Sequence, residues 1–103
     1  GSDYVLRAVN WMQTNYMNPV SISALAGELN LDRSYFSTLF RRQTGRSPQQ
    51  YLTELRLEKA RTLLLEYGYR PGEAAQAVGY ADIFSFSRMF KRRYGVSPSA
   101  LRR

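Results

Sequence analysis

Arginine and lysine side chains gather in two stretches of this 103-residue chain that contain no acidic residue. Residues 33–46 hold four bases and residues 83–103 hold six, so these stretches carry ten of the fifteen bases and none of the eight acids. Guanidinium and ammonium groups bind phosphates, and a surface on which they cluster attracts polyanions. Together with the net charge of +7, the two stretches predict a polyanionic partner.

Small hydroxyl side chains lie among these bases at helical spacing. Phe36 and Phe40 are one turn apart and must point to one side of a helix. A second side follows the i, i+3, i+4, i+7 rule with Ser34, Ser37, Thr38 and Arg41. Small polar groups flanked by bases suit a helix in a DNA major groove, because bulk would hold the backbone away from base edges. An ordinary solvent-exposed polar face is the other interpretation of this stripe taken alone.

The residue types exclude most reaction chemistry. Cysteine and histidine are absent, which excludes disulfides, thiolate nucleophiles, cysteine-ligated metals and imidazole as base or ligand. The eight acids show no spacing that suggests a paired-carboxylate site. We therefore expect no enzyme activity, no metal and no cofactor.

Neither end of the chain shows a targeting pattern. No apolar run approaches the ~20 residues of a membrane span, and no signal-peptide pattern precedes the domain. We expect a cytoplasmic protein with no membrane partner. Residues 1–2, Gly-Ser, have the form of a remnant left by tag cleavage, and the absence of an initiating Met suggests a fragment of a longer protein.

Apolar residues at helical period, punctuated by glycine and proline, predict an all-α fold of about seven helices. We expect helices over about 3–16, 22–29, 33–43, 48–67, 71–78, 83–94 and 99–102. The expected N-caps are Asp3, Ser21, Asp32 and Asp82. Asn30 is expected in the left-handed conformation, with Leu31 buried after it.

The second half of the chain repeats the first. Phe36, Phe40 and Gly45-x-Ser47-Pro48 recur fifty residues later as Phe86, Phe90 and Gly95-x-Ser97-Pro98. Upstream the offset is 49, so one residue is added in the second turn. Each copy consists of a short helix, a tight turn and a longer helix, which predicts two tandem helix-turn-helix units.

The motifs that carry this pattern also resemble a known family. The first half contains Ser21-Ile22-x-x-Leu25-Ala26, Phe36-Ser37-x-x-Phe40-Arg41, Gly45-x-Ser47-Pro48-x-x-Tyr51 and Arg56-Leu57-x-x-Ala60-x-x-Leu63-Leu64. The second half contains Ala75-x-x-Val78-Gly79-Tyr80-x-Asp82, Phe86-Ser87-Arg88-x-Phe90-Lys91 and Gly95-x-Ser97-Pro98. Over nearly all of residues 5–103, they resemble the DNA-binding domain of AraC-type transcription regulators.

The resemblance implies sequence-specific binding of double-stranded DNA in a bacterial transcription regulator, on the nucleoid in the cytoplasm. It implies recognition helices over about 33–43 and 83–93 in successive major grooves, joined by a rigid helix. We place the first unit at 3–48, the linker helix at 49–67 and the second unit at 68–103. In the family such a domain is usually fused to an N-terminal effector or dimerisation domain, which is expected to be missing here, and often contacts RNA polymerase.

The candidate DNA-binding residues fall into two groups. Those expected to face bases are Arg33, Ser34, Ser37, Thr38, Ser85, Ser87 and Arg88. Those expected to bind phosphates are Arg41, Arg42, Arg46, Lys91, Arg92 and Arg93. The alternative from another class is a basic helical module that binds an acidic protein. RNA is disfavoured, because a recognition helix does not fit the narrow A-form major groove.

A few positions depart from the family pattern or allow two interpretations. Ala74 and Pro71 stand where large aliphatic residues are common, which implies thinner packing under the second unit. Phe84 either packs into the core or touches a thymine methyl group. Arg56 either contacts phosphate or ties the linker helix to its neighbours. The aromatic side chains Trp11, Tyr16, Tyr35 and Tyr51 are expected in packing between helices.

Overall fold

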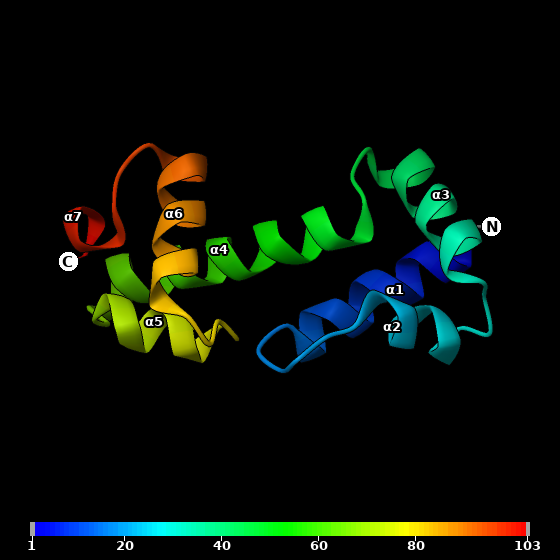
Figure 1. The fold of residues 1–103 in the computed structure, drawn as a ribbon, viewed down its shortest axis with the longest axis horizontal. Helices are drawn as coiled ribbons and strands as arrows, with labels where there is room; N and C mark the ends of the chain where they lie inside the picture. The colour runs from blue at the N-terminus through cyan, green and yellow to red at the C-terminus, as the bar shows by residue number, and fades with distance from the viewer. Residues whose placement is uncertain (1, 103) are drawn as a thin grey trace. The chain divides into compact units, whose positions relative to one another are not determined.

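The computed structural model describes residues 2–102, and every regular element within them is an α-helix. Figure 1 shows the seven helices in chain order. Their bounds are α1 Ser2–Asn15, α2 Ile22–Glu28, α3 Arg33–Thr44, α4 Pro48–Tyr67, α5 Pro71–Ala77, α6 Ile83–Tyr94 and α7 Pro98–Leu101. The predicted all-α fold of about seven helices is therefore confirmed. Gly1, part of the expected tag remnant, and Arg103 lie outside the described residues.

Three of the four expected N-caps are present. The side chains of Ser21, Asp32 and Asp82 each accept hydrogen bonds from backbone amides in the first turn of α2, α3 and α6. The expected cap at Asp3 is wrong, because α1 begins one residue earlier and Asp3 lies inside its first turn. There its carboxylate still favours the helix, since the N-terminal end carries partial positive charge.

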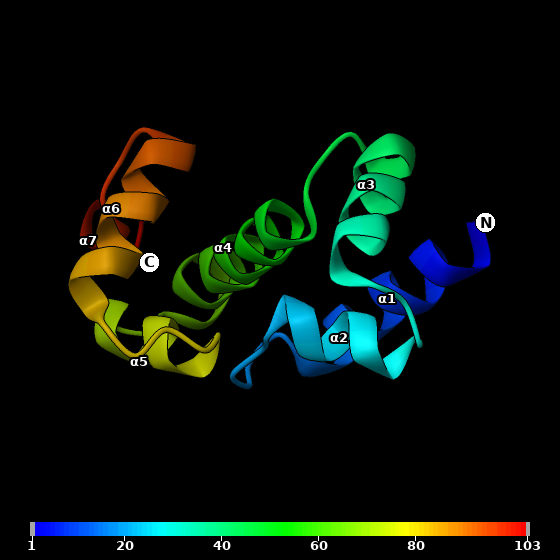
Figure 2. The same cartoon turned by 45° about the vertical axis from the view of Figure 1, so that its right-hand side comes forward.

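The chain divides into two compact units, the first extending to Glu54 and the second beginning at Leu55. Each unit contains a short helix and a longer one joined by a tight turn, α2 to α3 and α5 to α6 (Figure 2). The turns require a left-handed residue, and φ is 57° at Asn30 and 99° at Gly79. The next amide, of Leu31 or Tyr80, donates to a carbonyl five residues back at 2.9 Å. Both helices thus end in the same hydrogen-bonded closure.

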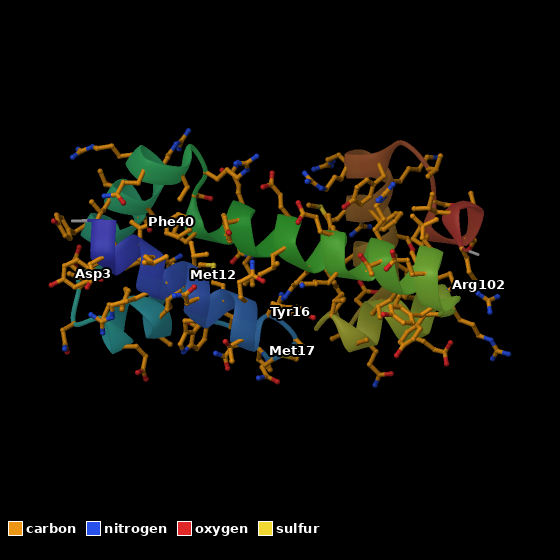
Figure 3. The ribbon with its side chains drawn as sticks, turned by 180° about the vertical axis from the view of Figure 1, so that it is seen from behind. Asp3, Met12, Tyr16, Met17, Phe40 and Arg102 are labelled. Carbon is orange, nitrogen blue, oxygen red and sulfur yellow. The ribbon has the colours of Figure 1, made fainter. Side chains whose placement is uncertain are left out.

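Two phenylalanines of α3 form the centre of the first core. Phe36 and Phe40 have no exposed surface, and their ring centroids lie 5.7 Å apart. Helix α3 contacts α1 and α2, and Met12 of α1, labelled together with Phe40 in Figure 3, is also fully buried. The Tyr51 ring meets the edge of Phe40 at 5.5 Å. Leu31, expected to be buried, is only half-buried beside this core.

The second core repeats this arrangement with α6. Phe86 and Phe90 are fully buried, with centroids 5.6 Å apart. Tyr80 approaches Phe86 at 5.4 Å and Tyr94 approaches Phe90 at 4.7 Å, so four rings form one row. Ala74 of α5 is also fully buried. Phe86 and Phe90 are therefore fully covered although Ala74 is smaller than the aliphatic residue common at this position.

Helix α4 contributes to both cores through different sides. Pro48, Leu52 and Leu55 form one buried set of α4, and Leu57, Ala60 and Leu64 form a second set that lies wholly in the second unit. At 3.6 residues per turn, each set shares one side of the helix, but the two sets do not share the same side. The helix therefore has no single apolar stripe. Its observed bounds are those predicted from the sequence.

We predict that Asn30→Ala destabilises the first unit by about 1 kcal/mol, because a Cβ-bearing residue without a polar side chain disfavours the left-handed conformation. Asn30→Gly should leave stability near the wild-type value, since glycine adopts this conformation readily. Asn30 is exposed, so neither change removes packing. Thermal unfolding followed by circular dichroism measures both. Equal stability of the alanine and glycine variants would contradict the role of φ.

Candidate nucleic-acid interface

The second helix of each unit has one buried side and one exposed side at corresponding positions. On α3 and α6 we call the exposed side the outer row. Its members are Ser34, Ser37, Thr38 and Arg41 on α3, and Phe84, Ser87, Arg88 and Lys91 on α6. In both helices the second member is half-buried and the other three are exposed. The phenylalanine pairs on the opposite side fix which way each row points.

Phe84 lies in the outer row with 74% of its surface exposed. The interpretation that Phe84 packs into the core is therefore wrong. At 3.6 residues per turn its position lies about 160° from Phe86 and about 120° from Phe90 around the helix axis, so its side chain points away from both. Tyr35, also expected in packing, is 55% exposed for the same reason, because it lies beside the buried side of α3 and not on it.

Three polar side chains form a chain of hydrogen bonds at the start of α6. The Ser85 hydroxyl donates to the Asp82 carboxylate at 2.8 Å, and Arg88 donates to the Ser85 oxygen at 3.4 Å. The Ser85 hydroxyl and the Phe84 amide hold the pKa of Asp82 below its usual range, and Arg88 adds a smaller effect. The structure thus directs Ser85, a predicted base-facing residue, toward Asp82 and Arg88. The spacing of three residues from Asp82 to Ser85 and from Ser85 to Arg88 allows these contacts, but the spacing does not fix the Ser85 rotamer.

The first unit has a different polar contact at the start of its second helix, α3. Arg33, the first residue of α3, donates to the Ser23 hydroxyl of α2 at 3.1 Å. The corresponding residues of the second unit are Gly72 and Ile83. Neither residue carries a polar side chain, so this polar contact has no equivalent in the second unit, where a Cβ added at Gly72 would lie 3.6 Å from the Ile83 side chain.

An open cleft of about 480 Å³ lies at these two residues of the second unit. Its lining residues come from α5, the turn and the start of α6: Gly72, Ala75, Gln76, Tyr80, Ala81 and Ile83. Ala81 is the residue by which the second turn is longer than the first. Ala74 and Pro71, on which the expectation of thinner packing rested, are not among the residues that line this cleft.

The predicted phosphate-binding residues fall into two classes. Arg41, Arg42, Lys91 and Arg92 are exposed, and none of them forms an ion pair among the residues that the structure describes. Arg46 instead pairs with Glu54 and Arg93 with Glu58 at 3.1 Å, in each case an acid of α4. The Arg93 guanidinium also lies 5.5 Å from the Tyr94 ring centroid. These last two cations are already partly neutralised.

Arg56 lies half-buried in α4 beside Tyr80. Burial lowers the pKa of Arg56 and raises the pKa of Tyr80, and each group partly opposes the shift of the other. This environment favours the interpretation that Arg56 ties the linker helix to its neighbours. At the other end of the second unit, Arg102, labelled in Figure 3, donates to the Gly68 carbonyl at 3.0 Å.

The described side chains form no cluster of three or more groups suited to a metal ion. Among residues 2–102, moreover, no helix combines the length and the apolar character that crossing a membrane requires. What the two units present is therefore a pair of exposed helices with hydroxyl and cationic side chains.

This arrangement defines a helix-turn-helix protein, and residues 25–103 match the helix-turn-helix domain family. The raffinose operon transcriptional regulatory protein RafR of Pediococcus pentosaceus is 45% identical over 93% of this chain and 35% of its own length. The lactose operon transcription activator of Staphylococcus xylosus is 32% identical over 95% of this chain, also with 35% of its own length. The chain thus spans about a third of the length of these relatives.

Two solved structures share the fold. The C-terminal domain of AraT, a response regulator from Geobacillus stearothermophilus, has a TM-score of 0.92 at 34% identity, covering 96% of this chain and 83% of that one. The DNA-binding domain of AdpA, solved in complex with a target DNA, has a TM-score of 0.89 at 28% identity, covering 93% and 86%. The chain belongs to the AraC-type helix-turn-helix family, as the motifs indicated, and is a DNA-binding domain of a transcription regulator.

We predict that Ser85→Ala raises the pKa of Asp82 toward its ordinary value of about 3.9, because the strongest hydrogen bond to the carboxylate is lost. A depressed pKa contributes stability that is present above the unfolded-state pKa and lost as pH falls through the folded-state value. The melting temperature of the wild type should therefore fall more steeply under acid than that of the variant. Carboxyl NMR titration measures the pKa directly, and a wild-type value at or above the ordinary one would contradict the prediction.

Proposed function

We propose that this chain binds double-stranded DNA sequence-specifically by placing α3 and α6 in major grooves, by binding rather than catalysis. The observation that carries the proposal is the pair of exposed outer rows, each held outward by a buried phenylalanine pair and each on a helix without acidic residues. An α-helix fits the B-form major groove, where the base edges are distinguishable.

The base-reading role falls to the exposed polar members of the outer rows. Ser34 and Thr38 on α3 are short, and they allow close approach of the backbone to base edges. Arg88 on α6 is aligned by Ser85 and Asp82, and a guanidinium so aligned reads guanine by a bidentate pair. Ser37 and Ser87 are half-buried, so they contribute less to base reading than the exposed members. Arg33 has to give up its hydrogen bond to Ser23 before it can bind a base.

The phosphate-binding role falls first to the exposed cations of the C-terminal turns, Arg41, Arg42, Lys91 and Arg92. Arg46 and Arg93 contribute less, because each has to exchange an acid of α4 for a phosphate. Their ion pairs are exposed and therefore weak, so the exchange costs little. Phosphate contacts position the helices, and base contacts specify the sequence.

The relatives are about three times longer than this chain, so we propose that it serves as the DNA-binding part of a longer bacterial regulator in the cytoplasm. Effector sensing or dimerisation then belongs to another region of that regulator. Contact with RNA polymerase is a further proposed role of the assembled protein on nucleoid DNA.

We predict a steep dependence of DNA affinity on salt. If about six to ten phosphates are contacted, affinity should fall roughly 10³- to 10⁵-fold between about 50 and 200 mM salt. Arg42→Gln and Arg92→Gln should each lower the slope by about one charge while leaving sequence preference unchanged. Arg46→Gln should lower it less, since Arg46 pairs with Glu54.

Fluorescence anisotropy with a labelled duplex measures these slopes. The matched control is Arg7→Gln, which removes an exposed base of α1 outside both basic stretches. A salt-independent affinity, or a control that changes the slope as much as the other variants, would contradict the assignment of phosphate contacts.

We predict that the two units read separate, non-palindromic half-sites, because they are tandem copies in one chain. Selection from a random duplex library should enrich one such motif, whereas a module for acidic proteins would enrich none. Inserting about five base pairs between the half-sites turns one of them to the opposite face of the duplex and should weaken binding strongly. Undiminished binding to that probe would show that only one unit reads DNA.

A further inference from the structure

The two units differ at one place in their otherwise matching outer rows. In the first unit the first outer position is Ser34 and the next residue is the aromatic Tyr35, whereas the second unit has Phe84 followed by Ser85. The aromatic side chain is thus displaced by one position, from beside the outer row into it. Of the large hydrophobic side chains exposed in the described chain, Phe84 has the greatest exposed fraction.

The backbone at Phe84 is held in place although its ring is in solvent. The Phe84 amide donates to the Asp82 carboxylate at 3.0 Å, and the following turn continues the helix through Phe86, which is fully buried. An exposed aromatic ring on a rigid backbone is ready to bury its surface against a partner without an ordering cost for the chain.

The surroundings of Phe84 identify the kind of partner. After Phe84 the outer row continues with the half-buried Ser87 and the exposed cations Arg88 and Lys91. An apolar protein surface would leave these cations desolvated without partners. The DNA major groove offers phosphates at its walls and one apolar group on a base edge, the C5-methyl of thymine.

We propose that Phe84 contacts a thymine methyl group, so that the half-site of the second unit contains a thymine opposite the start of α6. The inference rests on the proposed function and extends it from DNA binding to the identity of one base. The first unit makes no equivalent contact, because Ser34 offers only a hydroxyl at the corresponding position. The first positions of the two outer rows therefore select bases by different chemistry, polar at Ser34 and apolar at Phe84.

The test removes the methyl group without changing any hydrogen bond. The probe is the duplex enriched by this chain from a random library, with each thymine replaced in turn by deoxyuracil. Wild-type affinity should fall roughly fourfold at one thymine, which corresponds to one buried methyl group returned to water. Phe84→Ser, which installs the residue of the first unit, should bind the thymine and deoxyuracil probes equally.

The matched control is Tyr67→Ser, which removes another highly exposed ring, 69% exposed, at the end of α4. It should retain the fourfold response. Phe84 is outside the core, so Phe84→Ser should keep the wild-type melting temperature, which verifies that the variant is folded.

The possible results distinguish a failure of DNA binding from a failure of the contact between Phe84 and thymine. If no motif is enriched, the proposed function fails and the thymine contact fails with it. If a motif is enriched but contains no thymine sensitive to deoxyuracil, or if Phe84→Ser shows the same sensitivity as the wild type, DNA binding stands and the contact with Phe84 is overturned.

Discussion

The interaction on which both units depend is the burial of two phenylalanines one turn apart on the second helix. Phe36 and Phe40 in α3, and Phe86 and Phe90 in α6, have no surface exposed to solvent. Because an α-helix is rigid, fixing one side of it also fixes the direction of the other. The outer rows owe their exposure to this burial, and no residue of an outer row has to contribute to stability.

The local features of this fold were predictable because short-range rules govern them. Pro48 and Gly68 bound α4, and the caps at Asp32 and Asp82 set the starts of α3 and α6. The features that were not predicted depend on the direction of a side chain or on contacts with residues far away in the sequence. Phe84 is as apolar as a core residue, and only its angular position relative to Phe86 shows that it faces solvent.

The candidate interface was predictable to a similar degree. Helical period alone places Ser34, Ser37, Thr38, Ser87 and Arg88 on the outer rows, whereas Arg33 and Ser85, also expected to face bases, lie outside these rows. Residue types and spacing could not indicate which cations are already paired, because Arg93 and Glu58 are 35 residues apart in the chain. Nor could they show that Ser85 turns its hydroxyl to Asp82, because the side-chain rotamer decides between that contact and an outward one.

The contact between the two helices of each unit has a consequence for how the units diverge. In the first unit it is a hydrogen bond from Arg33 to Ser23, and in the second the corresponding residues, Ile83 and Gly72, line one open cleft. Neither involves the phenylalanine pair or the residues of the outer row. A duplicated gene segment can therefore change its target by mutation at surface positions while inheriting an intact scaffold.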